Sequence, residues 1–184
     1  MRHRRNSHKV TFQLHVITIS PRAKSNQEFA FDPSHTDRIE KSIELSAPIA
    51  RVWNALTNYR EFGQWFRVAL QGPFIAGQPA VGHITYPGYE HVQFWAEIVR
   101  IEPQHKFAFH WHPYAVDTSV VYSEELPTLV TFTLRPTAQG CHLTVAESGF
   151  DKVPAQRRAE AFRMNERGWA AQLENIAHHI ATQS

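Results

Sequence analysis

The sequence is poor in cysteine and has no long apolar run. Its one cysteine, Cys141, excludes an internal disulfide framework and a zinc site built from several cysteines, and it fits a reducing compartment. No stretch approaches the roughly 18 uninterrupted apolar residues that a membrane span needs. We therefore expect a cytoplasmic protein that does not enter a membrane.

Cofactor and nucleophile motifs are also missing. The sequence contains no Gly-x-Ser-x-Gly elbow, no P-loop and no dinucleotide-binding glycine pattern, so it gives no reason to expect a cofactor. The net charge is +2, but residues 1–38 hold seven basic and three acidic residues, and the remainder holds twelve and fourteen. Because the larger part of the chain is not basic, we do not expect nucleic-acid binding.

Residues 1–36 differ from the rest of the chain. Arginines at positions 2, 4 and 5 precede a β-prone run over residues 10–19, and no acidic residue occurs before Glu28. Gln13 and His15 interrupt the apolar run, which argues against a secretory signal, and a transit peptide is the second alternative. We predict a loosely ordered basic leader over 1–36, followed by one domain over 37–184.

Residues 155–181 predict a long amphipathic helix. Phe162, Trp169, Leu173, Ile176 and Ile180 recur at helical spacing and share one face. The other face is charged, with Arg157, Arg158, Arg163, Glu166, Arg167 and Glu174. An apolar stripe of this length must be covered by another part of the protein.

Upstream of this helix, short alternating runs predict strands, separated by Pro- and Gly-containing turns. We expect a strand over 39–45, a short helix capped by Ser46 and a second short helix that begins at Asn58. Further strands are predicted over 81–86, 92–101, 106–112, 128–135 and 141–147, with a polar connection over 113–127. This order predicts an α+β protein in which a curved antiparallel sheet of six to seven strands wraps around the C-terminal helix.

Four stretches of the sequence resemble one superfamily. They are the Ser-Ala-Pro opening over 46–57, residues 98–111 with their Glu-Pro turn, residues 128–144, and Gly168-Trp169 followed by Leu173 and Ile176. Together they resemble the helix-grip superfamily, also called START-like or SRPBCC, and within it the branch of the heat-shock-protein-90 ATPase activator. The resemblance covers about residues 39–181.

The resemblance implies a helix-grip fold with a cavity between the long helix and the sheet. It leaves function open, because the superfamily includes carriers of lipids and hydrophobic ligands, aromatase/cyclases, hydrolases and co-chaperones. The first hypothesis is a binding protein for a small hydrophobic or aromatic molecule. The alternatives are a cyclase- or hydrolase-type enzyme with a pocket Glu, His or Tyr, and a chaperone-interacting module. A homodimer is a further possible assembly.

Large side chains are the candidates for lining such a cavity. In the strand 106–112, Phe107, Phe109 and Trp111 lie on one face. The full set of predicted ligand-binding residues is Trp65, Phe66, Tyr86, Trp95, Phe107, Phe109, Trp111, Phe132, Trp169 and Leu173. The alternative is a solid core without a cavity, because aromatic rings fill space well.

Candidates for other chemistry are weaker. His110 and His112 share a strand face and would need a third ligand, from His83, His91 or Glu97, to hold a metal. The expectation is a solvent-facing histidine pair and no metal site. For acid–base catalysis the candidates are Glu97, Glu147, Tyr86 and Tyr122, and no catalytic residue is assigned. Cys141 is expected to point inward, and His178 and His179 are expected to be exposed.

Overall fold

The computed structural model describes residues 37–183, so the predicted leader of residues 1–36 lies outside the described part. The described chain runs from one strand through two short helices and a series of strands to a long helix. Its elements are β1 (Arg38–Leu45), α2 (Ile49–Thr57), α3 (Tyr59–Phe66), β2 (Val68–Leu70), β3 (Pro79–Ile84), β4 (Gln93–Glu102), β5 (Lys106–Trp111), η1 (Tyr122–Glu124), β6 (Thr128–Thr137), β7 (Gly140–Ser148), η2 (Phe150–Lys152) and α4 (Ala155–Thr182).

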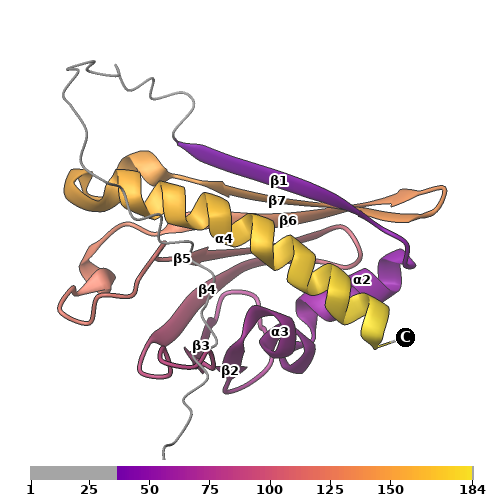
Figure 1. The fold of residues 1–184 in the computed structure, drawn as a ribbon, viewed down its shortest axis with the longest axis horizontal. Coiled ribbons are helices and arrows are strands. Elements are labelled where there is room, and N and C mark those ends of the chain that lie inside the picture. The colour runs from indigo at the N-terminus through magenta and orange to yellow at the C-terminus, as the bar shows by residue number, and fades with distance from the viewer. Residues whose placement is uncertain (1–36, 184) are drawn as a thin grey trace, which may run out of the picture.

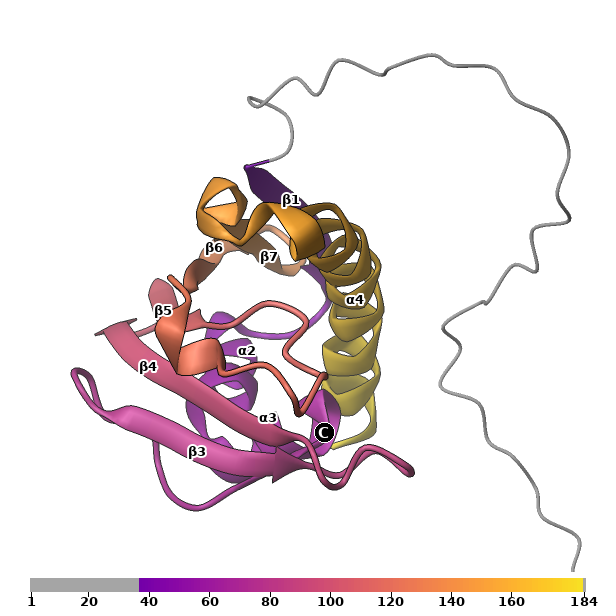
Figure 2. The same cartoon turned by 90° about the vertical axis from the view of Figure 1, so that its left-hand side faces the viewer.

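The strands form one seven-stranded antiparallel sheet in the order β1-β7-β6-β5-β4-β3-β2. The alternation in β6 and β7 sets the register, because Phe132 pairs with Val145 and Leu134 with Leu143, and these inward-facing side chains are buried. The sheet curls but does not close (Figure 2). The structure thus confirms the predicted α+β class and strand number, and it adds the three-residue strand β2.

The helix α4 lies across the hollow side of this sheet (Figures 1 and 2). Its buried face contains Trp169, Leu173, Ile176 and Ile180, each at most 5% exposed. Burying four such side chains stabilises the fold by roughly 6–12 kcal/mol before chain entropy is subtracted, at about 1.5–3 kcal/mol for each. The predicted arrangement of the long helix on the sheet is therefore confirmed.

The two short helices behave differently at their starts. Asn58 caps α3, because its Oδ1 accepts hydrogen bonds from the backbone N–H groups of Arg60 (3.0 Å) and Glu61 (3.3 Å). The helix α2 has Pro48 at its N-cap, and no side chain caps it. The expected cap by Ser46 is therefore wrong, since the proline places the helix start two residues later.

His179 is a second correction. It is 7% exposed, and its Nε2 lies 2.9 Å from Oε2 of Glu61, which also accepts a hydrogen bond from Arg51. Burial acts to raise the pKa of Glu61, but the hydrogen bonds from His179 and Arg51 outweigh it and lower the pKa. The expected exposure holds for His178 but not for His179, which joins the end of α4 to α2 and α3.

Two expectations from composition can be compared with the described residues. Cys141 is fully buried beside Leu143, as predicted. Across residues 37–183, no helix combines the length and the hydropathy that a membrane crossing needs.

Candidate functional site

A pocket of about 850 Å³ lies where α4, the sheet and the 113–127 connection meet. Strands β4 and β5 supply one wall, the end of α3 supplies Phe66 and Arg67, and α4 supplies Asn165 and Gln172. The connection forms the opposite wall. Seven of the 24 lining residues are aromatic: Phe66, Tyr86, Phe94, Trp95, Trp111, Tyr114 and Tyr122.

The structure separates the ten predicted ligand-binding residues into two groups. Four of them line this pocket: Phe66, Tyr86, Trp95 and Trp111. The other six lie in the packed interior beneath α4: Trp65, Phe107, Phe109, Phe132, Trp169 and Leu173.

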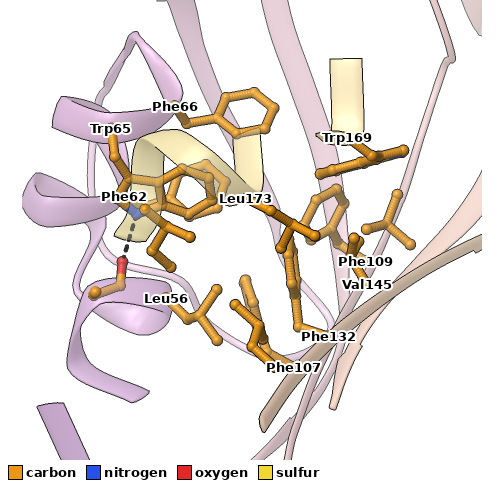
Figure 3. Close-up of a cluster of buried hydrophobic side chains, with 14 of the residues drawn as sticks. Leu56, Phe62, Trp65, Phe66, Phe107, Phe109, Phe132, Val145, Trp169 and Leu173 are labelled. Atoms are coloured by element: carbon orange, nitrogen blue, oxygen red, sulfur yellow. Dashed lines mark hydrogen bonds between the residues drawn. The ribbon is translucent and has the colours of Figure 1, made fainter. Parts of the chain in front are cut away.

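The interior group is a continuous cluster of rings (Figure 3). Phe132 lies with its ring centre 5.7 Å from that of Trp169 and 6.3 Å from that of Phe109. Trp65 closes the other side and donates a hydrogen bond from Nε1 to the backbone oxygen of Ala55 (2.8 Å). Rings at these separations fill the space between helix and sheet, so this part of the interior is core.

A buried carboxylate, Glu147, lies immediately behind the pocket. It is fully buried, and its two oxygens accept hydrogen bonds from four side chains. The donors are Thr128 Oγ1 at 2.6 Å, Trp169 Nε1 at 2.6 Å, Trp111 Nε1 at 2.7 Å, and Asn165 Nδ2 at 2.9 and 3.1 Å. Two of these donors, Trp111 and Asn165, are also pocket residues.

Burial and hydrogen bonding act in opposite directions on Glu147. Burial raises its pKa above the ordinary value of 4.5, and the hydrogen bonds from the four donors reduce that rise without cancelling it. No cation lies among its hydrogen-bond partners in the described chain, so the group depends on neutral donors. Glu147 therefore fixes the two pocket residues Trp111 and Asn165 in place.

The sequence contained a signal for both of these polar residues. Glu147 continues the alternation of Cys141, Leu143 and Val145, so it occupies an inward position at the end of β7. Asn165 lies four residues before Trp169 on the buried face of α4. A polar residue at an inward position of both elements predicts an internal hydrogen-bond network.

The other acid–base candidates have ordinary surroundings. The Glu97 side chain is 52% exposed and lies 3.8 Å from Nδ1 of His110. Tyr86 and Tyr122 both line the pocket, and the hydroxyl of Tyr122 accepts a hydrogen bond from the backbone N–H of Asp117 (3.1 Å). Catalysis by any of these groups stays a prediction.

His112 lies in the pocket wall and not on the open surface that was expected for it. Its ring is stacked on Trp95 with centres 5.3 Å apart, and it lies 6.2 Å from the ring of Tyr122. Burial lowers the pKa of His112, which favours the neutral imidazole. Within residues 37–183, no group of three or more histidine, cysteine or acidic side chains is arranged to hold a metal.

The 113–127 connection is attached to α4 by Arg157. Its guanidinium forms an ion pair with Glu125 through two nitrogens, donates to the backbone oxygen of Pro113 (2.8 Å) and lies 5.0 Å from the ring centre of Tyr122. Arg157 was expected on the charged outer face of the helix, but its side chain is only 16% exposed. Arg157 therefore joins α4 to both ends of the pocket wall, at Pro113 and at Glu125.

Comparison with known families gives a match over most of the domain. The sequence model of the family described as "Activator of Hsp90 ATPase homolog 1-like protein" matches residues 46–181. No curated protein matches the chain.

Solved structures with the same fold include a protein from Mesorhizobium loti, with a TM-score of 0.63 and 24% identity, covering 80% of this chain and 98% of that one. The Aha1 dimer from Colwellia psychrerythraea has a TM-score of 0.58 and 13% identity, covering 78% and 95%. DynU16, from the dynemicin biosynthetic locus, has a TM-score of 0.58 and 23% identity, covering 80% of this chain but 48% of its own. At these identities the likeness shows the fold.

Proposed function

The chain belongs to the family of activator of Hsp90 ATPase homolog 1-like proteins, and from this premise we propose that it binds a small hydrophobic or aromatic ligand in the pocket beside α4. The volume, about 850 Å³, lies within the range of roughly 300–1,000 Å³ that is usual for small-molecule sites. The observation that supports the proposal most strongly is the set of aromatic rings around this pocket.

A second hollow makes a useful contrast. It measures about 460 Å³, lies against α3 and β2, and has Tyr59 as the aromatic residue of its lining. Its other lining residues are polar ones such as Arg60 and Gln64 and small or medium-sized apolar ones, so a ligand there would meet a single aromatic side chain. The aromatic pocket offers more apolar contact for each atom of a hydrophobic ligand, so it is the proposed site.

Calorimetric titration with neutral bicyclic aromatic compounds tests the proposal. We expect saturable binding, and we expect Trp95→Ala to weaken it about tenfold, the loss that follows from removing roughly 60 Å² of apolar contact. Trp53→Ala is the matched control, because this tryptophan lies on α2 outside the pocket lining. Absence of saturable binding for aromatic and aliphatic compounds alike would refute the proposal.

A chaperone-interacting module is the second candidate function, and an exposed feature favours it. Val121 and Leu126, on the 113–127 connection, are 58% and 63% exposed. Contiguous exposed apolar patches are typical of contact sites for protein partners, and these two side chains lie five positions apart on one connection. The family description names the ATPase of Hsp90, and the Colwellia relative is named as an Aha1 dimer, so an Hsp90 chaperone and a second copy are the partners to test.

The test compares Hsp90 ATPase rates with the wild-type protein and with a Val121→Ser, Leu126→Ser double variant. This candidate is supported if the wild-type protein raises the Hsp90 ATPase rate and the double variant does not. Ile75→Ser is the control, since Ile75 is 56% exposed but lies outside the connection. Equal rates with and without the protein would reject it. Light scattering on the free protein determines whether the expected homodimer forms, and a cytoplasmic location remains part of the proposal.

A further inference from the structure

Asn165, on α4, lines the pocket and also donates hydrogen bonds to the buried Glu147. It is 8% exposed and belongs to the pocket lining. Its side-chain nitrogen Nδ2 lies 2.9 Å from Oε2 and 3.1 Å from Oε1 of Glu147. The orientation of this amide therefore depends on what Glu147 requires.

Glu147 permits one orientation of the Asn165 amide. With the amide turned over, Oδ1 would face both carboxylate oxygens at hydrogen-bond distance, and three acceptors without a proton between them repel one another. This holds while Glu147 is ionised, because a carboxylate has no proton to donate. In the protonated acid, a proton on Oε1 that is donated to Thr128 Oγ1 (2.6 Å) keeps Asn165 as the donor, and the Thr128 proton then has the backbone oxygen of Trp111 at 3.4 Å.

The other end of the same amide is then an unused acceptor. Within residues 37–183, no hydrogen bond reaches Oδ1 of Asn165. Oδ1 of Asn165 is also accessible. If it were fully buried, it would be a buried polar atom without a partner, and in this part of the chain the one such side-chain atom is Nδ1 of His112. An open acceptor in an aromatic wall is a point at which a ligand can be recognised.

We infer that Asn165 determines the ligand class of this pocket: its Oδ1 accepts a hydrogen bond from a hydroxyl or amine group on a hydrophobic or aromatic ligand. This inference rests on the proposed function. A ligand that offers only acceptors leaves Oδ1 unpaired, and a ligand carboxylate would place a negative charge against Oδ1 and close to Glu147. The pocket therefore selects hydroxylated or amino-substituted aromatic molecules over their ethers and their acids.

Three compounds of one ring size test the inference by calorimetry on the full chain. They are 2-naphthol, which has a donor, 2-methoxynaphthalene, which has an acceptor only, and 2-naphthoate, which is an anion. We expect 2-naphthol to bind about twofold to twelvefold more tightly than the ether, the range for one neutral hydrogen bond, and the anion to bind most weakly.

Asn165→Leu removes the acceptor and keeps the size of the side chain, so we expect the preference for 2-naphthol over the ether to fall to about onefold. Asn175→Leu is the control, because Asn175 is an exposed amide on the same helix outside the pocket, and its preference should equal that of the wild type. A preference that survives Asn165→Leu overturns the assignment to Asn165.

The wild-type series decides the inference even where Asn165→Leu fails to fold. Equal affinity for 2-naphthol and the ether, or tighter binding of 2-naphthoate, overturns the inference and leaves the proposed function standing. If none of the three compounds binds, the inference fails, and the titrations with other aromatic and aliphatic compounds decide the proposed function.

Discussion

The space between α4 and the sheet has two parts that differ in what their aromatic rings do. Toward the middle of the helix, Phe132, Phe109 and Trp169 pack against each other and fill the space. Beside Asn165 and Gln172 of the helix, Trp111 and Trp95 line a pocket of about 850 Å³. The two parts meet at Glu147, which binds Trp169 on one side and Trp111 on the other.

The difference shows that aromatic content alone does not distinguish a filled core from an open pocket. Rings form a core where strands and helix face each other directly, as around Phe132. They line a pocket where a connection, here residues 113–127, lies between the sheet and the helix and keeps them apart. The physical distinction is therefore in which backbone segments bring the rings together.

The largest expected effect compares a ring from each part. Phe132→Ala should lower the free energy of unfolding by about 3–5 kcal/mol, because Phe132 is 1% exposed and its removal leaves a cavity. Trp95→Ala should lower it by less than about 1 kcal/mol, because Trp95 is 38% exposed. Denaturant unfolding measures both, and similar losses for the two variants would remove the distinction between core and pocket.

A smaller effect is expected at the boundary between the two parts. Glu147→Gln should lower the free energy of unfolding by about 2–3 kcal/mol, because the amide group cannot accept from all four donors and leaves at least one unpaired. Thermal or denaturant unfolding of the two proteins at pH 7 measures this loss. An unchanged stability would mean that the carboxylate is not needed to hold Trp111 and Asn165.

The same variant gives a pH dependence with a defined sign. Because the pKa of Glu147 is raised in the folded protein, its contribution is fully present below pH 4.5 and is lost as the pH rises through the raised pKa. The stability difference between wild type and Glu147→Gln should therefore shrink as the pH rises above 4.5. A difference that grows with pH would show that the four donors outweigh burial.

The smallest effect concerns the wall of the pocket. Arg157→Ala should lower the free energy of unfolding by about 1–2 kcal/mol, since it leaves Glu125 largely buried without its ion pair. Amide hydrogen exchange should speed up across residues 113–127 and remain unchanged in the ring-filled core. Arg167→Ala, at an exposed position of the same helix, is the control. Unchanged exchange in 113–127 would show that Arg157 does not hold this wall.

Much of the fold was predictable, because local spacing determines it. The steps between Trp169, Leu173 and Ile176 predicted the buried face of α4, and the alternation of β6 predicted the buried side of the sheet. The strand β2 was missed because three residues are too few to show an alternation. The Ser46 cap was wrong because a cap depends on backbone geometry that the residue type does not determine.

Less of the site was predictable, because its contacts join distant residues. Glu147 accepts hydrogen bonds from Trp111, which lies 36 positions earlier in the sequence, and from Asn165, which lies 18 positions later. The pairing of Arg157 with Glu125, 32 positions apart, places a charged helix residue under a loop and not in water. The strand pattern put Trp111 on the inward face, but only the path of the 113–127 connection distinguishes it from its core neighbour Phe109.

The five tryptophans provide the most direct test of the account. In a ¹H–¹⁵N spectrum recorded during a titration with 2-naphthol, the indole signals of Trp95 and Trp111 should shift with saturation. The indole signals of Trp53 and Trp65 should stay in place, since Trp53 lies outside the pocket lining and the Trp65 indole N–H donates to the backbone oxygen of Ala55. Shifts at Trp65 with none at Trp95 and Trp111 would contradict the account, because the ligand would then occupy the space assigned to the core.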